Sequence, residues 1–139
     1  MSECISIQYK AELPDADSFF ELFRTTGWSS TKQKEELFEA ISNSWYSLSA
    51  YSNDRLVGFG RIISDGNLHA FIVDLIVLPE YQGQGIGKKI LNDLTAEAKN
   101  KGINDIQLFC AKGKKDFYLK NNFEERPENA PGMQYRIKN

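Results

Sequence analysis

Three places in the sequence carry residue types suited to chemistry: a glycine-rich loop, an aromatic pair and a carboxylate inside an apolar run. The loop, Gln82–Gly87, reads QGQGIG and lies between the apolar run Ala70–Leu78 and a stretch with helical apolar spacing. Glycines at a helix start let a ligand approach free backbone N–H groups, and the positive end of the helix dipole points at the same place. The loop therefore predicts an anion site, for which phosphate is the natural ligand.

The spacing of the loop excludes two familiar phosphate motifs. A Walker A loop requires glycine at Gln82 and Ser or Thr at Lys89. A dinucleotide GxGxxG loop requires glycine at Lys88 or Ile90. Gln82–Gly87 fits the pattern Q-x-x-G-x-G instead. Lys88 either helps to bind phosphate or is a solvated lysine on the first turn of an exposed helix.

The elements that position these residues follow from apolar periodicity, which is two for strands and 3.6 for helices. The predicted strands are Ile5–Tyr9, Tyr46–Tyr51, Leu56–Ile63, Ala70–Leu78, Ile106–Phe109, Phe123–Glu125 and Tyr135–Ile137. The predicted helices follow Pro14–Asp15, a capping box at Ser30–Gln33, and Gly85, with a short fourth helix over Lys114–Asn121. This order predicts an α/β fold with an antiparallel meander before the loop.

Composition limits the functional classes. A chain of 139 residues with 41% hydrophobic content predicts a single domain over residues 1–139. The net charge of −2 predicts neither a nucleic-acid nor a membrane partner. No apolar run approaches the roughly 20 residues of a membrane span, and MSECISIQYK does not read as a signal peptide, so a cytoplasmic location is expected. Cys4 and Cys110 are far apart and His69 is the single histidine, so neither a disulfide framework nor a metal site is expected.

A second motif lies about thirty residues after the loop. Phe117–Phe123 reads FYLKNNF and places an aromatic–Tyr pair near the end of a short helix. Together the two motifs resemble those of the GNAT superfamily of acyl-CoA-dependent N-acetyltransferases, and the order of elements resembles that fold over nearly the whole chain. Asn122 replaces the usual glycine, which is tolerable because Asn adopts the left-handed conformation at helix ends. The resemblance implies a mixed, mostly antiparallel central sheet with splayed strands, flanked by helices.

The resemblance also implies how acetyl-CoA is bound. The loop amides would hold the pyrophosphate, and the pantetheine arm would lie between Leu75–Val77 and Ile106–Cys110. A backbone N–H in Leu75–Val77, with Ile76 the first choice, would polarise the thioester carbonyl. The residues implied to bind the cosubstrate are Leu75, Ile76, Val77, Gln82, Gly83, Gln84, Gly85, Ile86, Gly87 and Lys88.

Two side chains are candidates for proton transfer. The resemblance implies that Tyr118 protonates the departing thiolate, although it could also be a core aromatic. The attacking amine, with a pKa near 10.4, needs a base or a desolvating pocket. Phe71 occupies the strand position where the family often places a base, so Asp74 is the nearest candidate. The alternative for Asp74 is a buried carboxylate bonded to a neighbouring backbone group or Tyr hydroxyl, and only a β-bulge would decide its direction.

These features predict an acetyl-CoA-dependent N-acetyltransferase that transfers acetyl directly to a primary amine, with no metal. A small-molecule acceptor is the first choice. The alternatives are acetylation of protein lysines or N-termini, and a non-catalytic CoA-binding or sensing module. The tail MQYRIKN could pair two copies into a homodimer, as C-terminal strands do in many relatives.

Overall fold

The computed structural model describes residues 6–28 and 30–137, so Cys4 and the predicted strand residue Ile5 lie outside the described residues. The chain divides into two compact units, Met1–Leu108 and Phe109–Asn139. The first unit contains the sheet and three α-helices, and the second contains one short helix.

The sheet of the first unit has five strands in the order β1-β2-β3-β4-β5. They are β1 (Ile7–Lys10), β2 (Tyr46–Ser52), β3 (Arg55–Ser64), β4 (His69–Val77) and β5 (Asp105–Leu108). The first three pairings are antiparallel and β4 pairs with β5 in parallel. The predicted mixed, mostly antiparallel sheet is confirmed.

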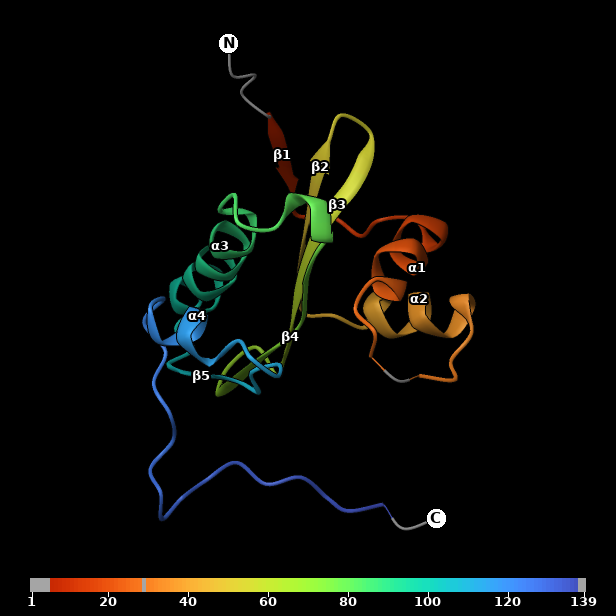
Figure 1. Ribbon diagram of the computed structural model, residues 1–139. Coiled ribbons are helices and arrows are strands. Elements are labelled where there is room, and N and C mark those ends of the chain that lie inside the picture. Colours follow the sequence, from red (N-terminus) through yellow and green to blue (C-terminus); the bar gives the residue numbers. More distant parts are fainter. Residues whose placement is uncertain (1–5, 29, 138–139) are drawn as a thin grey trace. The chain divides into compact units, whose positions relative to one another are not determined.

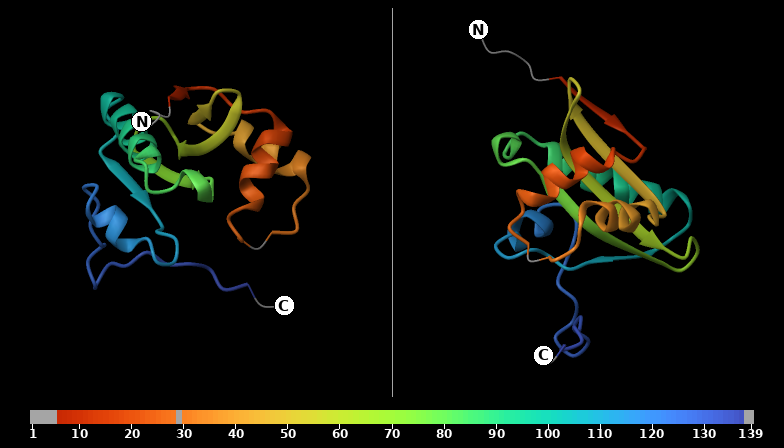
Figure 2. Two further views of the ribbon diagram at one scale, coloured as in Figure 1. Left: turned by 45° about the horizontal axis from the view of Figure 1, so that its top comes forward. Right: turned by 90° about the vertical axis from the view of Figure 1, so that its right-hand side faces the viewer.

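Helices cover both faces of this sheet (Figures 1 and 2). The long helix α3 (Ile86–Asn100) lies on one face and forms the crossover between β4 and β5, while α1 (Ala16–Arg24) and α2 (Lys34–Ser42) lie on the other. The ring of Phe19 on α1 packs edge-on against Phe59 on β3, with centroids 5.1 Å apart. Burial of such apolar side chains on both faces is the main driving force for this layered arrangement.

Two glycines on β3 allow α3 to approach the sheet closely. A Cβ at Gly60 would lie 2.7 Å from Cγ2 of Ile90 and 2.9 Å from Cδ1 of Leu94, and one at Gly58 would lie 3.1 Å from Cγ2 of Ile86. The absence of side chains at these positions therefore sets the distance between α3 and the sheet, and with it the position of the N-terminal end of α3.

The starts of α1 and α2 show one prediction confirmed and one corrected. Asp15 caps α1, accepting a hydrogen bond from the Ser18 N–H at 2.8 Å. The predicted cap of α2 at Ser30 is wrong, because α2 begins three residues later than that cap would allow. Its N-cap is Gln33, whose backbone N–H donates to the Glu36 carboxylate at 3.0 Å. Glutamate three residues after the cap decides the position.

The second unit contains α4 (Lys115–Leu119) and otherwise irregular backbone among its described residues. The predicted strands Phe123–Glu125 and Tyr135–Ile137 are therefore wrong. Alternating apolar residues specify a strand only where a neighbouring strand accepts the ladder hydrogen bonds. The alternating side chains Tyr135 and Ile137 are instead 85% and 73% exposed.

Within residues 6–28 and 30–137, no helix is both long enough and apolar enough to span a membrane.

Candidate functional site: a splayed strand edge and a glycine loop

The central strand β4 is paired on both edges for only part of its length. It pairs with β5 from His69 to Ile72, where Ile72 lies opposite Leu108, and β5 ends there. On its other edge β4 continues to pair with β3 as far as Val77. The edge of β4 beyond Ile72 therefore pairs with no strand among the described residues, next to the place where the sequence predicts a splay.

The alternation of the ladder decides which amides face this splay. The Leu78 N–H donates to the Val57 carbonyl at 2.9 Å, and donors on an antiparallel strand alternate between its two edges. The Ile76 amide, two residues earlier and opposite Phe59, therefore also faces β3. The amides of Leu75 and Val77 face the splay instead. This geometry favours Leu75 or Val77 over Ile76, the first choice from the sequence, as a donor to a bound carbonyl.

The glycine loop follows β4 and a 3-10 turn, η1 (Pro79–Tyr81). Gly83 and Gly85 have φ of +80° and +88°, a left-handed conformation that L side chains rarely adopt. No heavy atom lies within 4 Å of a Cβ built at either position. The space outside both glycines is therefore open, as close approach of a phosphate to the backbone requires.

The loop is tied to the strand that precedes it and opens α3. The side-chain amide of Gln82 donates to the Val77 carbonyl at 2.9 Å. Gly85 is the N-cap of α3, and its carbonyl accepts the first helical hydrogen bond, from the Lys89 N–H at 3.0 Å. The N–H groups of the first turn have no acceptor within the helix and carry its positive dipole end.

The two lysines of this turn differ in their contacts. The Lys89 ammonium lies 3.1 Å from the Asp93 carboxylate and 5.7 Å from the ring centroid of Tyr9 on β1. Lys88 is exposed and forms no ion pair with any residue of the described segments. Lys88 therefore remains a candidate for binding phosphate.

A β-bulge on β4 decides the direction of Asp74. The register shifts between Phe59↔Ile76 and Arg61↔Val73, which leaves Asp74 as the extra residue, with φ of +55°. Its carboxylate accepts a hydrogen bond from Nε of Arg61 at 2.7 Å. Asp74 is therefore held by a neighbour, as in the second alternative, but the partner is the Arg61 guanidinium and not a backbone group or a Tyr hydroxyl.

Tyr118 lies on α4, in the second unit, between two aromatic rings. The ring centroid of Phe117 is 5.1 Å away and that of Phe123 is 6.0 Å away, both edge-on. Burial raises the pKa of Tyr118 above its ordinary value, and the electrostatic interaction with Cys110 raises it further. The hydroxyl therefore keeps its proton at neutral pH, as an acid must, although its transfer to a thiolate becomes more uphill.

The turn after α4 behaves as the sequence predicts. Asn122 takes φ of +71°, and the Phe123 N–H returns to the Tyr118 carbonyl at 3.1 Å. Asparagine thus performs the helix-ending role of the more usual glycine.

Arg61 is the residue of this region that the sequence does not reveal. It lies 13 residues before its partner Asp74, within an apolar strand, and no motif in the sequence sets it apart from other basic residues. An isolated charge in each of two adjacent strands is a signal for such a pair, but the bulge sets their register.

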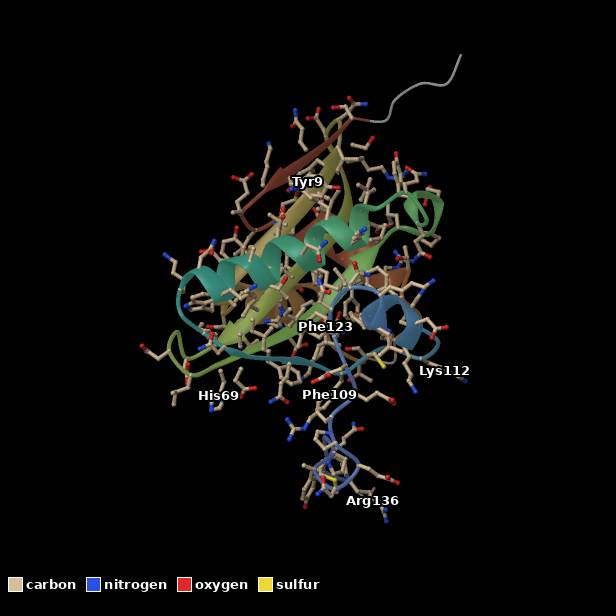
Figure 3. All side chains as sticks on the ribbon, turned by 90° about the vertical axis from the view of Figure 1, so that its left-hand side faces the viewer. Tyr9, His69, Phe109, Lys112, Phe123 and Arg136 are labelled. Atoms are coloured by element: carbon tan, nitrogen blue, oxygen red, sulfur yellow. The ribbon has the colours of Figure 1, made fainter. Side chains whose placement is uncertain are left out.

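A metal centre finds no support in the described segments, since no group of three or more His, Cys, Asp or Glu residues there could hold an ion. His69 is exposed at the start of β4, with Nδ1 2.5 Å from the Asp105 carboxylate. Figure 3 shows it among the exposed side chains.

Comparisons with known proteins agree with this geometry. Residues 13–123 match the model of the Acetyltransferase (GNAT) family, which confirms the resemblance predicted from the two motifs. Serotonin N-acetyltransferase 2, chloroplastic, from Oryza sativa subsp. japonica is 31% identical over 125 residues, covering 87% of this chain and 62% of that protein. The chain spans about half the length of two further curated relatives that it matches, 47% in each case.

Solved structures agree in fold over nearly the whole chain. A GNAT family acetyltransferase from Streptococcus pneumoniae TIGR4 is 30% identical with a TM-score of 0.80, covering 96% of this chain and 100% of the other. The PaiA N-acetyltransferase from Thermoplasma acidophilum, in complex with coenzyme A, is 25% identical with a TM-score of 0.71, covering 87% of this chain and 91% of the other.

Proposed function

Because the chain belongs to the Acetyltransferase (GNAT) family, we propose that it is an acetyl-CoA-dependent N-acetyltransferase that acts on a small-molecule primary amine. The observation that carries this proposal is the unpaired edge of β4 leading directly into a glycine loop with open space at Gly83 and Gly85. An extended arm ending in a pyrophosphate matches both parts of this surface.

The amides of the loop and of the first turn of α3 bind the pyrophosphate of CoA in this proposal. Gly83 and Gly85 permit backbone approach, and the dipole of α3 favours negative charge. Lys88 adds a positive charge beside them. Nothing in this binding mode depends on a particular side chain at Gln84 or Ile86.

The splayed edge of β4 binds the pantetheine arm and the thioester. The Val77 carbonyl already accepts a hydrogen bond from the Gln82 side chain. The donors on the gap side of β4 are the N–H groups of Leu75 and Val77. Acetyl-CoA supplies an activated acyl group. A preorganised backbone N–H stabilises the oxyanion that develops on its carbonyl, and such a donor is worth about 3 kcal/mol in the transition state.

Tyr118 donates the proton that the leaving thiolate takes up. Its pKa is raised by burial, so the hydroxyl is protonated across neutral pH. The role needs only transient donation, because a thiolate with a pKa near 8.5 is a tolerable leaving group without help. The amine must lose its proton before attack. A desolvating pocket meets that need when no side chain is poised as a base.

Two accessible aromatic rings support an acceptor with an aryl or apolar body. Phe23, at the end of α1, is partly exposed and its ring centroid lies 5.9 Å from that of Trp28, whose side chain is exposed. The rice relative is named for serotonin, which is an arylalkylamine.

Thiol release from acetyl-CoA across arylalkylamines, polyamines, amino sugars and peptides tests the proposal. The wild-type protein is expected to bind CoA in calorimetry and to release thiol fastest with an arylalkylamine. Release with peptides alone would indicate protein acetylation. CoA binding without release for any amine would favour a sensing module, and no CoA binding would overturn the whole proposal.

Three further properties of the protein remain predictions from the sequence. A single domain, a homodimer formed through the C-terminal tail and a cytoplasmic location are expected from the sequence, whereas the rice relative is named as chloroplastic.

A further inference from the structure

The half-buried ion pair between Arg61 and Asp74 connects three elements of the first unit. Nε of Arg61, on β3, donates to Oδ2 of Asp74, on β4, at 2.7 Å. Nη1 of the same guanidinium donates to the Ala40 carbonyl at 3.2 Å and lies 3.4 Å from Oγ of Ser44, at the C-terminal end of α2. The two paired side chains are only 11% and 22% exposed. Arginine suits this position because its rigid fork serves several acceptors at once.

The backbone at Asp74 takes a left-handed conformation. Asp74 is the extra residue of the bulge and has φ of +55°, a region that costs a side chain other than Gly, Asn or Asp a steric penalty. A bulge bends its strand and increases the local twist. The pair with Arg61 holds the extra residue toward α2 and so fixes the place where β4 bends.

That bend coincides with the start of the splay. Ile72↔Leu108 is the last pair between β4 and β5, and Asp74 follows two residues later. Leu75, which comes next, presents its amide to the gap and its side chain to α3, since Cδ1 lies 3.3 Å from a Cβ built at Gly60. The direction of the splay-facing amides therefore depends on the bulge.

We propose that Arg61 is a positioning residue that acts through Asp74: the ion pair locks the bulge of β4, and the bulge aims the Leu75 and Val77 amides at the thioester. The inference rests on the proposed acetyl transfer. It assigns to Asp74 a structural task in place of general-base catalysis, because a carboxylate that takes up a proton gives up its ion pair with Arg61.

Three substitutions of Asp74 separate the two roles. Asp74→Asn retains an acceptor oxygen and tolerates the left-handed conformation, and Asp74→Gly loses the side chain but adopts that conformation without strain. Asp74→Ala loses both. A positioning role predicts kcat within about tenfold of wild type for Asn and Gly, and a loss of roughly 10- to 100-fold for Ala. A base role predicts equal losses of roughly 10²- to 10⁴-fold for all three and the disappearance of one limb of the pH profile of kcat/KM.

Arg61→Met tests the partner, with Arg24→Met as the matched control. Arg24 forms an exposed pair with Glu21, and both residues belong to α1. Arg61→Met is expected to lower kcat as Asp74→Ala does, to leave the Kd of CoA within about twofold because the loop is untouched, and to speed amide hydrogen exchange in residues 72–77. Arg24→Met is expected to change none of the three.

A comparison of two double variants separates loss of positioning from misfolding of the protein. In the Arg61→Met background, Asp74→Gly is expected to recover kcat relative to Asp74→Ala, since glycine needs no ion pair to hold the bulge. Equal kcat for these two double variants, or unchanged exchange in residues 72–77 of Arg61→Met, would overturn the inference. Should the wild type release no thiol with any amine, the proposed function fails alone, because hydrogen exchange still decides whether Arg61 locks the bulge.

Discussion

The strand end and loop of residues 73–87 and the unit Phe109–Asn139 carry their chemistry in different ways. The first presents backbone amides, held by positive φ values at Asp74, Gly83 and Gly85 and by pairing with β3. The second holds the proposed acid, the hydroxyl of Tyr118, on a five-residue helix. A site built from amides tolerates many side-chain changes but few changes of backbone conformation. A site built on one hydroxyl is instead sensitive to the loss of that single side chain.

Gly85→Val is expected to have the largest effect, because it acts on the backbone that we propose to bind pyrophosphate. Valine at φ near +88° is strained, and its side chain fills the space that a phosphate needs. Loss of two hydrogen bonds to a charged group, about 2 kcal/mol each, corresponds to roughly 10³-fold in the Kd of CoA. Isothermal titration calorimetry measures this change.

Gly102→Val is the matched control for that prediction. Gly102 has φ of +84°, equally open space, and lies beyond the other end of α3. Both variants are expected to lose similar unfolding free energy in urea, but Gly102→Val keeps the wild-type Kd. Equal weakening of CoA binding in the two variants would show that strain, and not access, controls binding.

Tyr118→Phe is expected to lower kcat by about 100-fold, the lower end of the range for a general acid, while the Kd of CoA stays within about twofold. Since the raised pKa keeps the hydroxyl protonated at neutral pH, kcat of the wild type should show no alkaline decline from this group until the pH exceeds about 10. Steady-state kinetics from pH 6 to about 10 measure both effects. A Phe variant with wild-type kcat would place Tyr118 among ordinary packing residues.

Packing density also differs between the first and the second unit. Gly60→Ala places a methyl 2.7 Å from Ile90 in the closed layer beneath α3, and overpacking of this kind costs about 1 to 3 kcal/mol. Gly132→Ala places one 2.9 Å from the ring of Phe109, which is 64% exposed and able to shift, so a cost below about 0.5 kcal/mol is expected. Urea denaturation of both variants compares them, and a larger loss for Gly132→Ala would contradict the comparison.

What the sequence predicts well is local. The glycine loop, its helix and the left-handed Asn122 follow from residues within one or two turns of each other, because φ preferences and helix ends are local properties. The Arg61–Asp74 pair and the choice of amides facing the splay depend on a register shift between two strands, which no local pattern encodes. The same limit explains the wrong strand Tyr135–Ile137, where alternation is present but a pairing partner is not specified.

The smallest effect is expected in that tail. Tyr135→Ser combined with Ile137→Ser removes two exposed apolar side chains that make no strand ladder within the described residues of the second unit. Exposed positions of this kind change stability by less than about 0.5 kcal/mol. Urea denaturation and light scattering measure stability and mass together. A loss of unfolding free energy above about 1 kcal/mol, or a mass half that of wild type, would show that the alternating tail pairs with a second copy. The second unit would then depend on strand pairing, as β4 does.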